Sequence, residues 1–363
     1  PNGQEICSVF DYTLIKFRNK NKFPLHKDLA LLLGTSGSTG SPKLVKLTYE
    51  NIKSNALSII KYLSIDQTER PITTLPMSYS FGLSIINSHL YSGATLLLTN
   101  NSFFEKGFWT FLNSEKATSL SGVPYTFEML KKLRFFNMDI PSLTTITQAG
   151  GKLNDELNLE FAEYCKKTGK RFFVMYGQTE ATARMSYLPH KYSIKKLGRM
   201  GIAIPRGELS LIDENRSKID EPDKEGELVY KGSNVSMGYA ECNDDLANGD
   251  ENEGILKTGD LAKRDKDGFY YIVGRKKRFI KLYGNRVNLD ETERLIKNII
   301  PDCACSGQDD KMIIYLTESE RAEDVKHYIS QKMGINFQAF DIKCITEIPK
   351  NSSGKTIYSK LPL

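Results

Sequence analysis

The sequence has few of the features that mark secreted, zinc-stabilised or membrane-spanning proteins. Its six cysteines are scattered over 363 residues, and only Cys303 and Cys305 lie close together, so the spacing supports neither a disulfide framework nor a zinc site. The longest purely apolar runs are about five residues, whereas a membrane-spanning helix needs roughly 20. No basic start followed by an apolar stretch and a small-residue cleavage site is found near Pro1. We therefore expect a cytoplasmic protein with no membrane span.

Strong charge of one sign is also missing. The 50 Lys and Arg residues exceed the 44 Asp and Glu residues by 50 − 44 = 6. This mild excess lacks the focused basic stripe of nucleic-acid-binding proteins, and the aromatic residues are not interleaved with basic ones as a stacking platform requires. We therefore expect no nucleic-acid partner and keep that role as a distant alternative.

The length suits a large domain with a smaller one, and the 40% hydrophobic and 26% charged fractions are typical of folded chains.

The order of apolar runs predicts an α/β fold for the first half of the chain. Short apolar runs, typical of strands, alternate with stretches of helical period, which is the pattern of a sheet with helices on both faces. Thr48 and Asn154 are the expected N-caps of two of the helices, and Gly169 is expected to end the second. The predicted strands lie at residues 29–33, 94–99, 143–148 and 172–177, and the predicted helices at 48–63, 104–112 and from 154 onward.

The second half has a different texture. Residues 201–274 contain shorter strands bounded by Gly, Asp, Asn and Pro, which predicts a β-rich subdomain. A basic stretch at 274–287 and a helix at about 290–299 follow. We therefore expect a large N-terminal domain, residues 1–276, with helix-flanked β-sheets and the β-rich part, and a small α+β C-terminal lid domain, residues 277–363.

The clearest local pattern is TSGSTGSPK at residues 35–43, between a predicted strand and a predicted helix. Glycine lets the backbone turn its N–H groups toward an anion, while hydroxyls and a lysine add donors, so the loop suits a polyphosphate. It is not a Walker A loop, because the only GK[ST] triplet begins at Gly354 and the required upstream glycine position holds Pro349. A flexible Ser/Gly connector is the alternative.

This loop resembles the phosphate loop of the adenylate-forming, AMP-binding superfamily of acyl-CoA synthetases, luciferases and adenylation domains. Further signatures of that family follow in the same order and span nearly the whole chain: YGQTEAT at 176–182, GELVYKGSNVSMGYA at 226–240, KTGD and its continuation at 257–293, and PKNSSGK at 349–355. The resemblance implies a ligase that uses ATP and Mg²⁺ to convert a carboxylic acid to an acyl-adenylate. The acyl group then passes to a thiol, which is CoA or the phosphopantetheine of an acyl carrier protein.

The resemblance also assigns residues to the nucleotide. Glu180 matches the family's Mg²⁺ ligand, and Thr179 matches a hydroxyl that contacts phosphate. Asp260 matches the acid that accepts hydrogen bonds from the ribose hydroxyls, and Arg275 matches an arginine near the ribose and phosphate. The other nucleotide contacts that it implies are Thr35, Ser36, Gly37, Ser38, Thr39, Gly40 and Lys43 of the phosphate loop, Gly150 and Gly151 along adenine, and Tyr176 stacked on the base with Gly177 next to it.

Lys355 is the residue to which the resemblance gives the central catalytic role. When a carboxylate attacks the α-phosphate, the negative charges of both groups oppose their approach, and a lysine between them lowers that barrier. The alternative is a solvent-facing lysine near a frayed chain end.

The two half-reactions need different neighbours around one intermediate, which a moving lid provides. Lys277 matches the family's hinge position, and rotation there would remove Lys355 and bring the stretch from Lys281 to Gly284 into place for the thiol step. A basic surface patch is the alternative interpretation of residues 275–278.

The acid pocket is predicted from LPMSYSFGLS at residues 75–84 and SGVPYTF at 121–127. Tyr79 stands where many acyl-CoA synthetases have a histidine, and no acid is present between residues 75 and 84. Domains that activate α-amino acids place an aspartate there, because a buried ammonium needs a partner. We therefore expect an ordinary acyl or aryl carboxylate, lined by Tyr79, Phe81, Gly82, Val123 and Pro124.

The phosphate loop begins only a few dozen residues into this sequence, whereas members of the family usually carry a much longer segment before it. The sequence is therefore that of a compact relative or of a fragment. A non-catalytic nucleotide-binding protein, or one half of a split enzyme that needs a partner chain, remains an alternative function.

Overall fold

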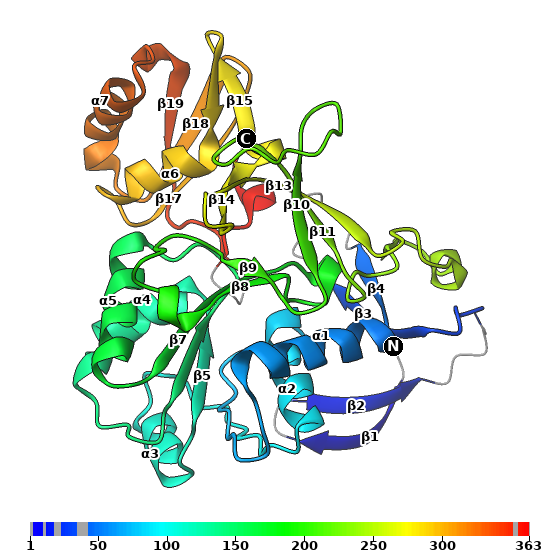
Figure 1. Ribbon diagram of the computed structural model, residues 1–363. Helices are drawn as coiled ribbons and strands as arrows, with labels where there is room; N and C mark the ends of the chain where they lie inside the picture. Colours follow the sequence, from blue (N-terminus) through cyan, green and yellow to red (C-terminus); the bar gives the residue numbers. More distant parts are fainter. Residues whose placement is uncertain (1–2, 10–11, 18–22, 35–42, 351–354, 363) are drawn as a thin grey trace.

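The computed structural model describes residues 3–9, 12–17, 23–34, 43–350 and 355–362 (Figure 1). It has the expected mixed α/β architecture, with a large helix-flanked part, a β-rich part in the middle of the chain and a small α+β part at the C-terminal end. No helix among these residues is long and apolar enough to cross a membrane.

The large part is built on a five-stranded sheet in the order β5-β6-β7-β8-β9. Strands β5, β6 and β7 are parallel, while β8 and β9 are antiparallel to their neighbours. Figure 1 shows helices α4 and α5 on one face of this sheet and α1 and α2 on the other. The strands are Ser119–Gly122, Thr145–Gln148, Arg171–Tyr176, Ser186–Leu188 and Ile202–Ala203, and helices α1 to α5 are Tyr49–Leu63, Ser80–Tyr91, Lys106–Ser114, Pro124–Lys132 and Asp155–Lys167.

Alternate side chains of β7 divide the interior into two cores. Phe172 and Val174 pack with residues of α4 and α5, whereas Phe173 and Met175 pack with residues of α1. Successive side chains of a strand point to opposite faces of the sheet, so a continuous apolar run is what a strand covered on both faces needs. The end of β7 is thereby fixed between the two layers of helices.

Two helix starts follow their predicted caps. Thr48 accepts a hydrogen bond from the Asn51 amide at 2.9 Å, and the Asn51 side chain accepts one from the Thr48 amide at 2.9 Å, which is a capping box. The Asn154 side chain accepts from the amides of the first turn of α5. That helix ends at Lys167, before Gly169 with its left-handed φ of +70°.

The predicted strand at residues 94–99 is wrong. This segment is extended, but it makes only one parallel bridge, between Leu97 and Ile72. Pro71, next to that partner, has no N–H with which to continue a ladder. Ala94 and Leu97 are buried by packing instead, and Leu97 belongs to the same core as α4 and α5, whereas Leu98 is 45% exposed.

Besides the five-stranded sheet and the strands of the C-terminal part, the described residues form two antiparallel sheets and a hairpin. The hairpin and strands β3 and β4 come before helix α1, and the other strands come from the β-rich middle of the chain. Strand β4 was not predicted; it lies between the first predicted strand and helix α1, and pairs with β3 and β12. The second sheet has the order β10-β11-β13-β14. These elements are β1 Gly3–Val9 and β2 Tyr12–Phe17 in the hairpin, β3 Leu29–Gly34, β4 Leu44–Thr48 and β12 Tyr239–Ala240, and β10 Glu208–Ile212, β11 Gly226–Lys231, β13 Ile255–Arg264 and β14 Tyr270–Arg275.

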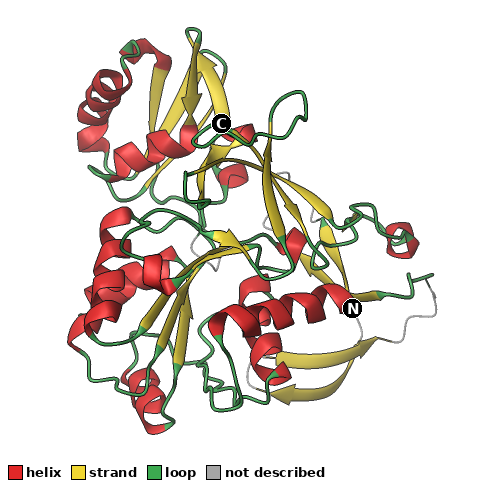
Figure 2. Cartoon of the chain, viewed as in Figure 1, coloured by secondary structure: helices red, strands yellow, loops and turns green. Residues whose placement is uncertain are grey.

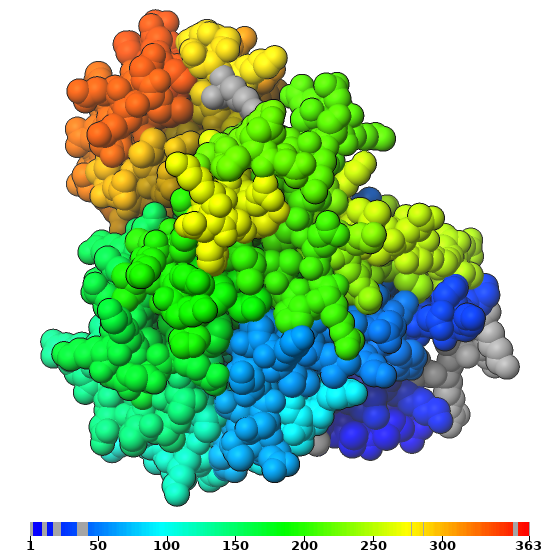
Figure 3. All heavy atoms as spheres, viewed as in Figure 1, coloured from blue at the N-terminus to red at the C-terminus, as the bar shows by residue number. Residues whose placement is uncertain are grey.

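The C-terminal part, called the lid below, has a hydrophobic core of its own, formed by residues between Ile280 and Phe340. In Figures 2 and 3 it packs against the end of the β-rich part and the large part. Its boundary at residue 277 stays a prediction. The elements of the lid are β15 Phe279–Leu282, β16 Asn285–Asn288, α6 Leu289–Lys297, β17 Cys303–Gln308, β18 Lys311–Leu316, α7 Ala322–Met333 and β19 Phe340–Cys344.

Candidate active site

A buried carboxylate, Asp260, forms the first part of the site. It lies on β13 opposite Arg275 on β14, because the two residues pair in the antiparallel ladder, and the Arg275 Nε is 3.3 Å from its Oδ1. Its Oδ2 accepts hydrogen bonds from the Tyr176 hydroxyl and from Gln178 Nε2 at 3.0 Å. Burial raises the pKa of Asp260, and the opposing effects of Arg275, Tyr176 and Gln178 are smaller. Asp260, Arg275 and Tyr176, which the sequence predicted for the nucleotide, therefore lie together. Gln178, which it did not predict, holds the same carboxylate.

Glu180 and Lys43 are connected through Tyr239. The Tyr239 hydroxyl donates to Glu180 Oε1 at 2.8 Å, and the Lys43 Nζ lies 5.9 Å from the centre of the Tyr239 ring. Lys43 also pairs with Glu241 at 2.5 Å. The two predicted phosphate-side residues thus face the same strand, β12, although they are far apart in the sequence.

The loop after β7 has a tightly constrained backbone. A Cβ at Gly177 would lie 1.7 Å from the Ala183 carbonyl oxygen, so the chain can pass itself this closely only at a glycine. Thr182 and Ala183 have positive φ angles of 53° and 87°. Within this loop the Thr179 hydroxyl lies 3.1 Å from that of Ser80, the first residue of α2. The loop is therefore fixed against the start of that helix.

Tyr79 joins the predicted acid pocket to the predicted adenine segment. A Cβ at Gly150, which has a φ of +86°, would lie 2.6 Å from the Tyr79 hydroxyl and 3.0 Å from Val123. A Cβ at Gly151 would lie 3.1 Å from Pro124. The glycine at 150 leaves the space that Tyr79 occupies, and the glycine at 151 allows the close approach to Pro124.

Phe81 and Gly82 lie on α2 beside Tyr79. The Phe81 and Tyr79 rings are 6.3 Å apart in an edge-to-face arrangement. A Cβ at Gly82 would lie 2.3 Å from the Pro76 carbonyl oxygen, so this glycine lets the helix turn back on the preceding segment.

Lys355 reaches this cluster from the C-terminal segment. Its Nζ lies 5.7 Å from the centre of the Tyr79 ring. Its pKa is lowered by burial and by the Arg275 charge, and raised to a smaller extent by Asp260 and Glu180. Lys355 therefore lies beside a residue predicted for the acid, and its pKa responds to the charges of three residues predicted for the nucleotide or its metal.

Other predicted residues cannot be placed in this cluster. Residues 35–40 of the phosphate loop lie outside the described residues, and so do 351–354 just before Lys355. Lys281 and Gly284 lie on the exposed β15–β16 hairpin, where the Lys281 amide donates to Asp309 at 2.8 Å. Lys277 lies in the 3₁₀ turn Lys276–Arg278 between β14 and β15. Their roles in the hinge and thiol steps stay predictions.

The sequence analysis missed several residues that shape the site. Asn234 donates to the Ala181 and Arg184 carbonyls at 2.7 and 3.0 Å and thereby holds the loop after β7. Arg184, in that loop, is almost fully buried next to Phe81. Tyr239 and Asn234 lie inside the quoted signature at 226–240, so that motif was the available signal. Arg184 lies just beyond YGQTEAT, and no motif in the sequence pointed to it.

The donors fit a nucleotide with magnesium better than a metal bound by protein alone. Among the described residues, no group of three or more His, Cys, Asp or Glu side chains could hold a metal ion. Mg²⁺ is usually bound through one or two carboxylates together with substrate phosphates and water. The single carboxylate of Glu180, with Oε1 held by Tyr239, is consistent with that mode.

The fold and the cluster define a class of proteins in which a small C-terminal part contributes a lysine to a site on a larger α/β part. The model of the family described as AMP-binding enzyme matches residues 8–240. This chain belongs to the AMP-binding enzyme family.

Three comparisons with known proteins agree with this assignment. The chain is 28% identical to 4-coumarate--CoA ligase-like 2 of Arabidopsis thaliana, with 92% of this chain and 61% of that protein covered. It is 28% identical to 2-succinylbenzoate--CoA ligase of Bacillus subtilis, with 92% and 68% covered. The structure of O-succinylbenzoate coenzyme A synthetase from Bacillus subtilis in complex with ATP and magnesium ion is similar at a TM-score of 0.76 and 25% identity, over 96% of this chain and 73% of that one. The chain thus spans 61% and 68% of the two curated relatives.

Proposed function

We propose that this chain is an ATP-dependent, AMP-forming acid–thiol ligase that activates a carboxylic acid as its acyl-adenylate and transfers the acyl group to CoA. The observation that carries the proposal is the position of Lys355, whose ammonium group lies 5.7 Å from the Tyr79 ring and within the electrostatic influence of Arg275, Asp260 and Glu180. The names of the two curated relatives, both CoA ligases, support it.

In the first half-reaction a carboxylate oxygen bonds to the α-phosphorus of ATP, and the bond from that phosphorus to the leaving pyrophosphate breaks. Charge accumulates on the acid and the phosphate as they approach, and the Lys355 ammonium offsets it. Burial of Lys355 strengthens this effect, because the same charge acts in a lower dielectric. The residue therefore serves the transition state more than the bound substrates.

In this proposal the nucleotide is held by the residues that the family resemblance assigns to it, some of which contact one another. Asp260 accepts hydrogen bonds from the ribose hydroxyls, with Arg275 next to it, and Tyr176 covers the base beside Gly150 and Gly151. In the structure the Tyr176 hydroxyl is already fixed on Asp260. The ring is therefore oriented before the nucleotide binds, which limits the entropy lost on binding.

Glu180 would hold Mg²⁺, which supplies Lewis-acid stabilisation of the phosphate charge when bound. Thr179, Lys43 and the residues of the phosphate loop hold the phosphates. Tyr239 orients Glu180 through its hydrogen bond at 2.8 Å, as a neighbour of a metal ligand often does.

In the second half-reaction the thiol sulfur bonds to the acyl carbonyl carbon, the bond from that carbon to the phosphate oxygen of AMP breaks, and AMP leaves while the thiol proton passes to solvent. The thiol needs the space where Lys355 now lies. Rotation of the lid about Lys277 removes the lysine and brings the Lys281–Gly284 hairpin toward the acyl carbonyl. CoA is the acceptor that we propose, and the phosphopantetheine of an acyl carrier protein is the alternative. Trapping the acyl product with CoA or with a loaded carrier protein separates the two acceptors.

Acid-dependent exchange of pyrophosphate into ATP tests the first half-reaction. We expect exchange with a member of a broad panel of acyl and aryl acids, and a loss of about 100-fold or more in Lys355→Met, which corresponds to roughly 3 kcal/mol. Lys360→Met is the matched control, because Lys360 is an exposed lysine in the same terminal segment. Full exchange by Lys355→Met would contradict the proposed role.

A non-catalytic or split nucleotide-binding protein is the second candidate function, because the chain spans only part of its curated relatives. Binding of ATP without acid-dependent release of AMP, for every acid in the panel, would favour it. Recovery of AMP release on addition of a partner chain would identify a split enzyme.

A further inference from the structure

Arg184 is the largest side chain that is fully buried, with 1% of its surface exposed. It lies in the loop between the 3₁₀ turn Thr179–Ala181 and β8. Removing a guanidinium from water is costly unless a carboxylate or several hydrogen-bond acceptors replace the water. A buried arginine therefore indicates either an ion pair or a site for an anion.

The structure gives Arg184 no ion pair with a described carboxylate. Its hydrogen bonds to described residues leave from Nη1, toward the Tyr62 hydroxyl at 3.1 Å and the Met175 sulfur. Its Cζ lies 4.2 Å from the centre of the Phe81 ring. Its Nε is buried and has no hydrogen-bond partner. Nε and Nη2 form the edge of the guanidinium that binds a carboxylate in bidentate fashion. At Nε this edge lacks a hydrogen-bond acceptor.

A small cavity with both apolar and polar lining residues includes Arg184 in its wall. Its volume is about 10 Å³, which is about the space of one water molecule or one carboxylate oxygen. Besides Arg184, its polar lining includes Ser121, Thr147 and His89. The lining also contains one carboxylate, Glu69, but Arg171 pairs with it at 3.6 Å and Thr118 donates to it. Glu69 is therefore committed elsewhere.

The guanidinium adjoins a residue that the sequence predicts for the acid pocket. Phe81, over which Arg184 stacks, contacts the Tyr79 ring, and Tyr79 contacts Lys355. Arg184 and Tyr79 are close enough for the cation to lower the pKa of the tyrosine against the effect of burial. An acid whose reacting carboxylate lies near Lys355 and whose far end follows these contacts would point toward Arg184.

The backbone around Arg184 is held firmly. Its carbonyl oxygen accepts hydrogen bonds from the Asn55 and Asn234 side chains, each at 3.0 Å. The two residues before it, Thr182 and Ala183, adopt positive φ angles, which non-glycine residues rarely adopt and which cluster at functional sites. The surrounding structure thus maintains a strained loop that places a cation in the interior.

We propose that Arg184 binds a second carboxylate at the far end of the substrate, so that the acid activated by this chain is a short dicarboxylic acid. The inference rests on the proposed function and specifies its substrate class. An apolar acyl chain would leave the Arg184 Nε buried without an acceptor, whereas a second carboxylate supplies both charge and hydrogen-bond acceptors. The small cavity limits how far the substrate extends beyond the guanidinium.

The test compares dicarboxylic acids of three to eight carbons, each beside the monocarboxylic acid of the same carbon number. Affinity is measured calorimetrically and activation by pyrophosphate exchange, for the wild type, Arg184→Met, Arg184→Lys and Arg171→Met. Arg171→Met is the matched control, because that arginine lines the same cavity but already has Glu69 as its partner. Arg184→Met is expected to fold, since an apolar side chain replaces a buried cation without an ionic partner.

We expect the wild type to bind its preferred diacid about 100-fold more tightly than the matched monoacid, and Arg184→Met to lose about 100-fold for the diacid alone. Arg171→Met should keep the diacid preference. Exchange with monoacids and no diacid preference in the wild type would overturn this inference but support the proposed function. Arg184-dependent diacid binding without exchange would support the inference for binding and contradict the proposed activation. If Arg184→Met does not fold, two other measurements test the inference: the preference of the wild type for diacids over monoacids, and the diacid affinity of Arg184→Lys.

Discussion

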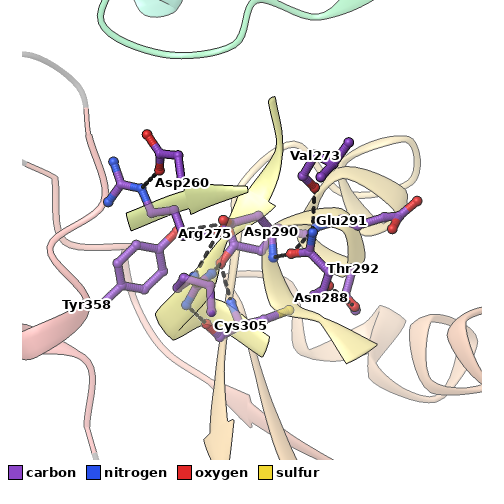
Figure 4. A network of polar contacts seen from close by, with 11 residues as sticks. Asp260, Val273, Arg275, Asn288, Asp290, Glu291, Thr292, Cys305 and Tyr358 are labelled. Atoms are coloured by element: carbon purple, nitrogen blue, oxygen red, sulfur yellow. Dashed lines mark hydrogen bonds and ion pairs between the residues drawn. The ribbon is translucent and has the colours of Figure 1, made fainter. Parts of the chain in front are cut away.

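The lid contains a buried ionic network whose disruption should unfold the lid before the rest of the molecule. Arg278 donates to Glu293 at 2.5 Å, to Asp290 at 2.7 Å and to the Cys305 carbonyl at 2.7 Å. Its guanidinium also stacks on Tyr358, whose hydroxyl donates to Glu293 at 3.0 Å. Figure 4 shows the network, with Asp290, Cys305 and Tyr358 labelled. The substitution Arg278→Met removes the cation that Asp290 and Glu293 share.

The expected loss follows from the burial of the partner left behind. The Arg278 and Glu293 side chains are only 13% and 8% exposed, so solvent would compensate Glu293 poorly. Breaking a buried pair by removing one member costs about 3–5 kcal/mol. Lys311→Met is the matched control, because Lys311 pairs with Asp341 at 2.9 Å on the surface, where 57% and 48% of the side chains are exposed. An exposed pair contributes about 0–1 kcal/mol.

Urea unfolding followed by two signals measures the effect. The single tryptophan, Trp109, lies in α3 of the large part, where its indole donates to the Phe103 carbonyl at 2.8 Å. Its fluorescence therefore reports the large part, whereas far-ultraviolet circular dichroism reports helices α6 and α7 as well. We expect Arg278→Met to give an early transition in circular dichroism that is absent from the fluorescence.

The pH dependence has a defined sign. Burial raises the pKa of Glu293, partly against the effect of Arg278, so the folded lid binds the Glu293 proton more tightly than the unfolded chain does. Without Arg278 this difference grows, and the loss of stability should shrink as the pH falls through the raised pKa. Arg278→Met/Glu293→Met should recover most of the loss. An Arg278→Met midpoint no lower than that of Lys311→Met would refute this reasoning.

Two further predictions concern the active site. Gly177→Ala places a Cβ 1.7 Å from the Ala183 carbonyl oxygen, so we expect a loss of about 1–3 kcal/mol in unfolding free energy together with reduced ATP binding. Thermal unfolding and nucleotide titration measure the two effects. Unchanged stability and unchanged ATP affinity would contradict the observed backbone. Burial and the Arg275 charge lower the pKa of Lys355, so the rate of pyrophosphate exchange should decline with rising pH at a lower pH than an ordinary lysine gives. Arg275→Gln should move that decline to higher pH. An unchanged pH profile in Arg275→Gln would exclude the electrostatic effect of Arg275 on Lys355.

Local signals in the sequence predicted what local physics decides. Thr48 and Asn154 cap helices through bonds to amides within three residues, so these starts could be predicted without knowledge of the fold. The segment 94–99 shows the opposite case, because an apolar run becomes a strand only where a neighbour can continue the ladder. The residues of 94–99 do not show which segment the fold places beside them.

The candidate site divides in the same way. Asp260, Arg275, Glu180 and Lys355 could be proposed because each lies in a recognisable motif, and the structure brings them near one another. Arg184 could not be proposed, since its significance depends on burial by Tyr62 and Phe81, which come from other parts of the chain. A charged residue has the same letter in the sequence whether it is solvated or enclosed.

The C-terminal segment ties Lys355 to the body of the lid on both sides. The Ile357 amide donates to the Pro349 carbonyl at 2.7 Å, and Leu361 packs with Ala304 and Tyr315 in a small core. A displacement of Lys355 larger than the length of its side chain therefore requires rotation of the whole lid. In the proposed cycle each turnover must then include two such reorientations, and motions of whole domains take microseconds to milliseconds. The frequency of lid rotation thus sets an upper limit on how many acyl groups the protein delivers per second.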